Sequence, residues 1–87
     1  MGLTVYACVA AWKIVGGSDL ADKVEELASR CRSICTVYYA EGGPVIYEFY
    51  AKKHVLLREL RAAGLDELAK IVAECGDGDV SLLVNVL

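Results

Sequence analysis

Apolar and polar residues alternate along the chain in blocks that predict strands and helices. Residues 3–14, LTVYACVAAWKI, are rich in strand-forming residues and contain no Gly or Pro, which predicts one long strand. After Gly16 and Gly17, apolar residues recur at helical spacing, and Ser18 or Asp19 can cap the helix that this spacing predicts. Its apolar positions are Leu20, Val24, Leu27 and Cys31.

The middle of the chain has the signal of a β-hairpin. Residues 34–40 and 45–51 are two short β-rich runs, separated by the turn sequence of residues 41–44, EGGP. The two glycines can take the positive φ that tight hairpin turns require. This region also holds five of the seven aromatic residues of the chain.

A second helical pattern begins near Lys52 or Lys53 and ends at Cys75. Gly64 interrupts it, which predicts either a stop with a restart at Asp66 or a kink. After a turn rich in Gly and Asp, residues 80–87, VSLLVNVL, form the last predicted strand.

The predicted order is β-α-β-β-α-β within a single domain, residues 1–87. Short right-handed crossovers then favour the α+β ferredoxin-like fold, a four-stranded antiparallel sheet with both helices on one face. The first and third predicted strands would lie in the middle of that sheet, which suits their strongly apolar sequences.

Side chains alternate across a strand, so each predicted strand divides into two rows. One row is almost purely apolar, includes Tyr39 and Tyr47, and should meet the helices. The other row is aromatic with few polar groups, which indicates a surface that contacts something other than water. The predicted interface residues in this outer row are Tyr6, Trp12, Tyr38, Ile46, Glu48, Tyr50, Leu83 and Asn85.

The composition supports a buried subunit contact. Hydrophobic residues make up 56% of the 87 residues, and the mean hydropathy is +0.43. No apolar run approaches the roughly 18 residues that span a bilayer, so no membrane partner is expected. The start of the chain lacks the basic region of a signal peptide, which favours a cytoplasmic location. The chain has no Gln and one Asn, a tendency of thermophile proteins.

The charge argues against nucleic acid as a partner. The net charge is −3 and the isoelectric point about 5.0, whereas nucleic-acid binding depends on Lys and Arg. Tyr6, Trp12 and Tyr50 are of the type that stacks on RNA bases in RNA-recognition motifs, but the basic aromatic motif of those domains is missing.

The four cysteines have no metal-ligand spacing, and no metal or cofactor is expected. Buried free thiols are the first interpretation. A disulfide is the second: Cys31 and Cys75 close the two helices, and Cys35 opens the second strand. Cys31–Cys75 and Cys35–Cys75 are therefore the candidate bridges, whereas Cys8 should stay apart in mid-strand.

Two places are candidate sites. Gly16, Gly17, Ser18 and Asp19 precede and open a helix, where free N–H groups could hold a small anion; a plain turn is the alternative. Glu48 is the one charge of the outer row and would be the base if the chain were an enzyme; a carboxylate at an interface is the alternative. His54 and the nearby Lys and Arg residues are expected to be solvated.

The chain resembles the small regulatory ACT domains and the similar ligand-binding domains of Lrp/AsnC regulators. The resemblance rests on the first strand, on IVGGSDLADKV at the first helix and on the hairpin YYAEGGPVIYEF. It implies a small regulatory domain with a small-molecule ligand.

A non-catalytic regulatory or assembly module is the favoured function, with a homodimer or higher homo-oligomer formed through the sheet and room for a small-molecule ligand. One alternative is a cofactor-independent dimeric α+β barrel enzyme, with Glu48 and tyrosines in a cavity between subunits. RNA binding on the sheet face is the weakest of the three.

Overall fold

The computed structural model describes residues 2–8, 10–15 and 18–86, which form five strands and three helices. The elements along the chain are β1 (Gly2–Ala7), β2 (Ala10–Val15), α1 (Ser18–Arg30), β3 (Cys35–Ala40), β4 (Gly43–Lys52), α2 (Lys53–Ala62), α3 (Asp66–Ala73) and β5 (Asp79–Val86).

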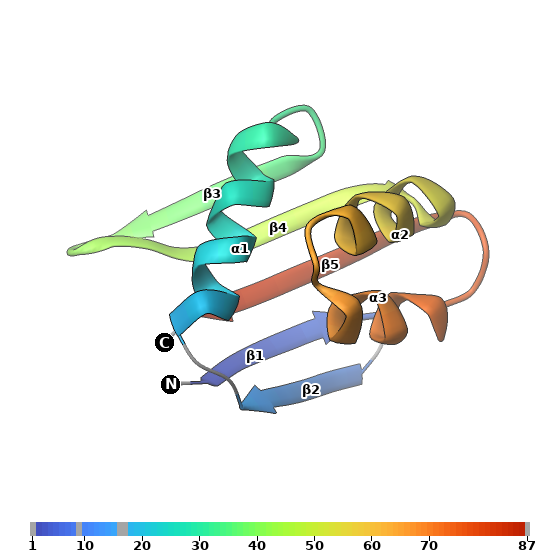
Figure 1. The fold of residues 1–87 in the computed structure, drawn as a ribbon, viewed down its shortest axis with the longest axis horizontal. Helices are drawn as coiled ribbons and strands as arrows, with labels where there is room; N and C mark the ends of the chain where they lie inside the picture. The colour runs from blue at the N-terminus through green and yellow to red at the C-terminus, as the bar shows by residue number, and fades with distance from the viewer. Residues whose placement is uncertain (1, 9, 16–17, 87) are drawn as a thin grey trace.

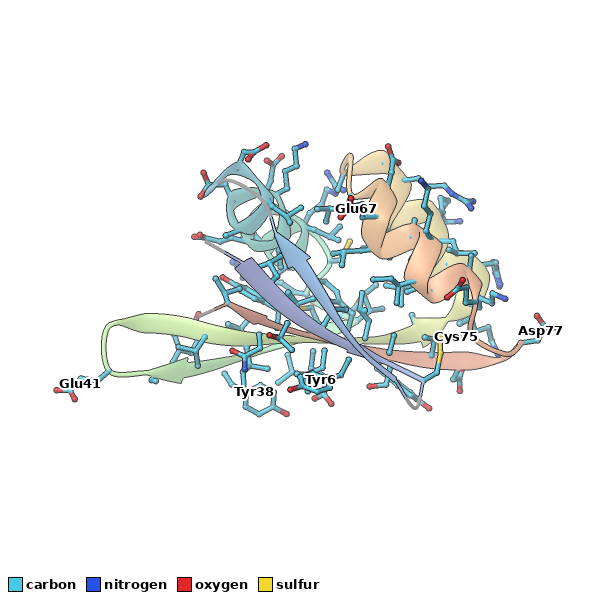
Figure 2. All side chains as sticks on the ribbon, turned by 90° about the horizontal axis from the view of Figure 1, so that it is seen from below. Tyr6, Tyr38, Glu41, Glu67, Cys75 and Asp77 are labelled. Carbon is cyan, nitrogen blue, oxygen red and sulfur yellow. A yellow bond between two sulfur atoms is a disulfide. The ribbon has the colours of Figure 1, made fainter. Side chains whose placement is uncertain are left out.

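The strands form one antiparallel sheet in the order β2-β1-β5-β4-β3, and the helices cover one face of it (Figures 1 and 2). The predicted α+β class, with helices on a single face, is therefore confirmed. The ferredoxin-like strand order is wrong, because the last strand, β5, lies in the middle of the sheet, and the first two strands lie together at one edge.

The difference between the predicted and the observed strand order arises at Cys8. Residues 3–14 do not form one strand; Ala7 pairs with Ala10, and the chain reverses between them. Cys8 has a φ of 59°, a left-handed conformation that non-glycine residues seldom adopt. Because the chain turns back there, α1 starts from the edge strand β2, and β5 occupies the place beside β1.

The second predicted helix stops and restarts at Gly64, one of the two expected outcomes. Gly64 has a φ of 77°, and the N–H of Leu65 donates to the carbonyl of Leu60 at 2.9 Å. A glycine tolerates this left-handed position at the end of a helix without the strain of a side chain. The predicted hairpin is also present, with Gly42 and Gly43 at positive φ.

The core lies between the sheet and the helices. The apolar row of each central strand points into it, as predicted, and Val5, Phe49 and Leu82 are fully buried. The helices contribute mainly leucines and valines to the same layer. Their fully buried members are Val24, Leu27, Leu56, Leu60, Leu68 and Val72.

Tyr39 corrects one part of the predicted pattern. It was expected inside, yet its exposed fraction is 73%. Tyr39 lies in the helix-side row with Cys35 and Val37, as predicted, although the pairing of β3 with β4 shifts between Tyr38 and Tyr39. It is exposed because the tip of this hairpin extends past α1, so no helix covers it (Figure 1).

None of the helices in the described part of the chain is long and apolar enough to cross a membrane.

Candidate functional site

The face of the sheet away from the helices has no helix over it (Figure 2). We call it the outer face. Tyr6, Tyr38 and Tyr50 lie on it with exposed fractions of 46%, 46% and 59%. Its described residues are Thr4, Tyr6, Thr36, Tyr38, Ile46, Glu48, Tyr50, Ser81, Leu83 and Asn85.

The structure thus brings together seven of the eight residues predicted for an interface. Trp12 is the exception. The register places it opposite Val5, and residues directly opposite in an antiparallel pair share a face, so its position belongs to the helix-side row. The reversal at Cys8 changes the phase of β2 relative to the predicted continuous strand; the side chain of Trp12 itself lies outside the described residues.

Leu83 occupies the centre of the outer face, on the middle strand β5. It pairs with Tyr6 of β1 on one side and with Glu48 of β4 on the other. Leu83 and Glu48 are half-buried by their neighbours. A branched apolar side chain therefore lies between a tyrosine and a carboxylate in one row across the sheet.

Glu48 has a partner within the chain. The hydroxyl of Tyr38 donates a hydrogen bond of 2.8 Å to its Oε1. This hydrogen bond is the main reason why the pKa of Tyr38 is raised, with the negative charge of Glu48 as a second cause. The phenol therefore stays protonated at neutral pH, and one carboxylate oxygen is occupied.

Polar groups of Tyr50, Lys52 and Asp79 interact at the edge of the outer face, near the start of β5. The hydroxyl of Tyr50 donates to Oδ2 of Asp79 at 3.3 Å, and Nζ of Lys52 lies 3.9 Å from Oδ1 of the same carboxylate. The hydroxyls of Tyr38 and Tyr50 are thus bonded within the chain, and the centre of the face offers mainly ring and aliphatic surface.

The predicted anion site is described only in part. Gly16 and Gly17 lie outside the described residues. Ser18 is the first residue of α1, and Asp19 is exposed in its first turn. A carboxylate at this position interacts favourably with the helix dipole by itself. Anion binding there stays a prediction.

The predicted disulfides are wrong. Cys75 is bonded to Cys8, with Cα atoms 5.7 Å apart, and Cys31 and Cys35 are free thiols. The turn at Cys8 brings that residue to the end of α3 (Figure 2), whereas α1 ends over another part of the sheet. The Sγ of Cys31 lies 3.5 Å from a carboxylate oxygen of Glu59 instead.

Lys53 has a structural role that its charged neighbourhood did not indicate. Its Nζ donates to the carbonyl of Cys75 at 2.7 Å and lies 3.9 Å from Oδ1 of Asp77, so it holds the loop before β5 against α2.

His54 is exposed in the first turn of α2, as expected. In the part of the chain that the structure describes, no group of three or more His, Cys, Asp or Glu side chains could hold a metal ion.

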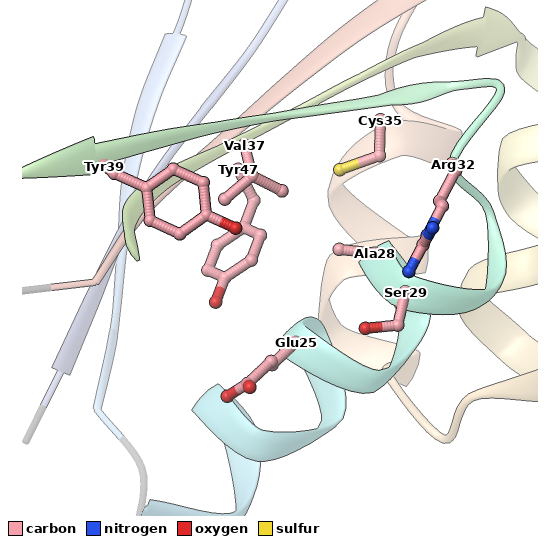
Figure 3. A pocket seen from close by; sticks show the side chains of 8 residues that line it. All are labelled: Glu25, Ala28, Ser29, Arg32, Cys35, Val37, Tyr39 and Tyr47. Carbon is pink, nitrogen blue, oxygen red and sulfur yellow. The ribbon is translucent and has the colours of Figure 1, made fainter. Parts of the chain in front are cut away.

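A cavity of about 380 Å³ lies on the helix side of the sheet, between α1 and the β3–β4 hairpin (Figure 3). Ala28, Val37 and Tyr47 line it together with two charged residues, Glu25 of α1 and Arg32 of the turn that follows. The sequence pattern placed Glu25 in solvent and Tyr47 in the core, so it did not indicate a cavity between them.

No family model matches this chain, and no curated protein or solved structure matches it either. The similarity to ACT domains and to the Lrp/AsnC ligand-binding domains stays a prediction from the sequence.

Proposed function

We propose that this protein is a non-catalytic assembly module that forms a homodimer through its outer face. One observation carries the proposal: five strands present a face without a covering helix, and its centre is Leu83 with tyrosines around it. Exposed tyrosines gathered around a leucine on one uncovered face are typical of an interaction site, where aromatic residues are enriched.

The size of the face fits a stable dimer. Viewed onto the sheet, as in Figure 1, the molecule measures 36 × 26 Å. The rectangle that encloses this view has an area of about 900 Å², so a face that fills most of it would be of the same order as the ~800 Å² that each partner buries in a standard interface.

The arrangement of the strands suits a second copy of this chain in particular. Because β5 is the middle strand, a twofold axis parallel to β5 at Leu83 would place β1 of each copy over β4 of its partner. Tyr6 and Glu48 flank Leu83 on opposite sides. Each Tyr6 hydroxyl would then face a partner Glu48, whose Oε2 is the oxygen that Tyr38 does not use.

This pairing also gives the one central charge a second hydrogen bond on burial, which a buried carboxylate requires. Sheets that pack face to face keep their strands within about 30° of each other. Leu83 of each copy would form the apolar centre of the contact.

The alternative, a dimeric barrel enzyme, requires an enclosed space around Glu48. A structure of the dimer separates the two proposals: a packed contact at Leu83 supports assembly, and a water-filled chamber around Glu48 supports catalysis.

We place the module in the cytoplasm of a thermophile. Disulfides are rare in most cytosolic proteins but occur inside hyperthermophiles. The Cys8–Cys75 bond and the low Asn and Gln content are consistent with such a host.

Leu83→Lys tests the proposal. The substitution puts an unpaired charge at the centre of the contact, and the dimer dissociation constant should rise by about a hundredfold or more. Sedimentation equilibrium measures it. Ala62→Lys, on the exposed end of α2, adds the same charge elsewhere and should leave the dimer intact. A native chain that sediments as a 9.4 kDa monomer at micromolar concentration would refute the proposal.

A further inference from the structure

Tyr47 has a hydroxyl group that the fold does not use. The residue is 4% exposed, and its hydroxyl has no hydrogen-bond partner among the described residues. The hydroxyl is not sealed in the core either; it opens into the cavity between α1 and the β3–β4 hairpin (Figure 3). Because the cavity is open to solvent, this hydroxyl is available to hydrogen-bond a ligand that enters it.

One end of the cavity suits a positive charge. The carboxylate of Glu25 and the hydroxyls of Tyr39 and Tyr47 point toward the same space (Figure 3). Burial, and then the negative charge of Glu25, raise the pKa of Tyr47, so the phenol stays protonated beside the carboxylate. An ammonium group here could pair with Glu25 and lie against the two aromatic rings.

The other end suits a negative charge. Arg32 follows the end of α1 at Arg30, and its guanidinium group lies near Ser29 (Figure 3). Ion pairs among the described residues involve Lys52 and Lys53 only, so Glu25 and Arg32 both have their charges available. Guanidinium groups bind carboxylates with two parallel hydrogen bonds.

The two charged ends are separated by an apolar floor of Ala28, Val37 and the ring of Tyr47. Residues 25 to 30 of α1 alone rise by roughly 8 Å along the helix axis. A cavity of about 380 Å³ is within the usual range for small-molecule sites.

From this arrangement we infer that the cavity binds a short linear zwitterion, with an ammonium group at Glu25 and Tyr47, an apolar chain over Val37, and a carboxylate at Arg32. A ligand whose two charged groups are attached to the same carbon cannot span the floor and should bind more weakly. The site is on the opposite side of the sheet from the outer face and does not depend on the proposed dimer.

The experiment uses 6-aminohexanoate as the probe, titrated into the full chain and followed by amide chemical shifts. Hexylamine lacks the carboxylate group, and hexanoate lacks the ammonium group. Glycine carries both charged groups on one carbon. We expect shifts that centre on Glu25, Val37 and Tyr47, and affinities at least about tenfold weaker for all three comparison compounds.

Variants separate the two ends. Glu25→Gln should weaken 6-aminohexanoate and hexylamine but leave hexanoate unchanged, and Arg32→Gln should do the reverse. Glu26→Gln and Arg30→Gln are matched controls, because both side chains are exposed and neither lines the cavity. Tyr47→Phe should reduce probe affinity about tenfold while the fold is retained; if that variant does not fold, the two surface variants still decide.

The inference is overturned if 6-aminohexanoate causes no shifts at these residues at millimolar concentration. It is also overturned if glycine binds as well, or if Glu25→Gln and Arg32→Gln behave like their controls. The monomeric Leu83→Lys variant should bind the probe as well as the native chain does, so a failure of the dimer proposal can be told apart from a failure of this one.

Discussion

The two faces of the sheet are made by the same strands, yet they differ in what covers them. On the inner face Phe49 is fully buried under the helices; one residue further along β4, Tyr50 is 59% exposed on the outer face. Both are large aromatic residues in a central strand. The difference teaches that residue type alone does not decide burial here: the phase of the strand relative to the helices does.

The same contrast separates the tyrosines. Tyr47 is 4% exposed on the inner side, whereas Tyr6 and Tyr38 are each 46% exposed on the outer side. The inner face of the central strands is packed under the helices, whereas the tyrosines of the outer face contact water in the single chain. If the outer face is an interface, its residues should affect assembly and not the stability of the subunit.

The largest effect is expected from Phe49→Ala. Truncating a fully buried aromatic side chain removes its burial and leaves a cavity, which costs about 3–5 kcal/mol of unfolding free energy. Urea denaturation measures it. The neighbouring Tyr50→Ala is the matched outer-face variant and should cost about 1 kcal/mol or less in a monomeric background. Equal losses of unfolding free energy in Phe49→Ala and Tyr50→Ala would contradict the view that only the inner face stabilises the subunit.

The disulfide joins the two layers and should have the next largest effect. Cys8 lies at the turn between β1 and β2, and Cys75 follows α3, at a separation of 67 positions in sequence. Cross-linking positions so far apart typically stabilises by roughly 2–4 kcal/mol. Cys8→Ser should lower the denaturation midpoint accordingly, with Cys35→Ser as the control.

Thiol counting checks the same bond directly. The denatured, non-reduced protein should show two free thiols, those of Cys31 and Cys35. A count of four would mean that the bond does not form, and in that case Cys8→Ser should have no larger effect than its control.

Tyr6→Phe sharpens the comparison on the outer face. If the Tyr6 hydroxyl donates to Glu48 of a second copy, its loss should weaken the dimer by about 1–2 kcal/mol, because the acceptor is charged. The stability of the monomer should not change, since the hydroxyl of Tyr6 has no partner among the described residues of its own chain. A double-mutant cycle with Glu48→Gln measures the coupling. An absence of coupling would contradict the proposed twofold axis.

The smallest effect concerns Cys35, on the inner side of the edge strand β3. Burial raises the pKa of its thiol to about 11 from the ordinary value of 9.0, with the negative fields of Cys31 and Glu48 as further causes. In the native chain, alkylation of Cys35 by iodoacetamide, assigned to this residue by mass spectrometry, should therefore be slow at pH 8. The rate should keep rising up to about pH 11.

The sign of the stability change follows from the same shift. Between pH 9.0 and about 11 the unfolded chain loses this proton while the folded chain keeps it. The folded state therefore binds more protons in that interval, and its stability falls as the pH rises through it. A Cys35 alkylation profile with a midpoint near 9.0 would show that the thiol is solvated.

The sequence by itself determined the local features of this protein. The alternation along β4 and β5 separated Phe49 and Leu82 from Tyr50 and Leu83 correctly, because the pleat of a strand fixes which side chains share a face. The glycines at 42, 43 and 64 marked the hairpin and the helix break, because each takes a positive φ that other residues avoid.

Only the tertiary structure decided which segments lie side by side. No turn residue marks the reversal at Cys8, and the apolar row of residues 3–14 reads equally well as one strand. That single reversal moved β5 to the centre of the sheet, changed the phase of β2 and brought Cys8 to Cys75. The cavity at Tyr47 likewise depends on how α1 lies over a hairpin distant in sequence. The local periodicity of a sequence does not predict which distant segments come into contact, because the packing of the whole chain determines those contacts.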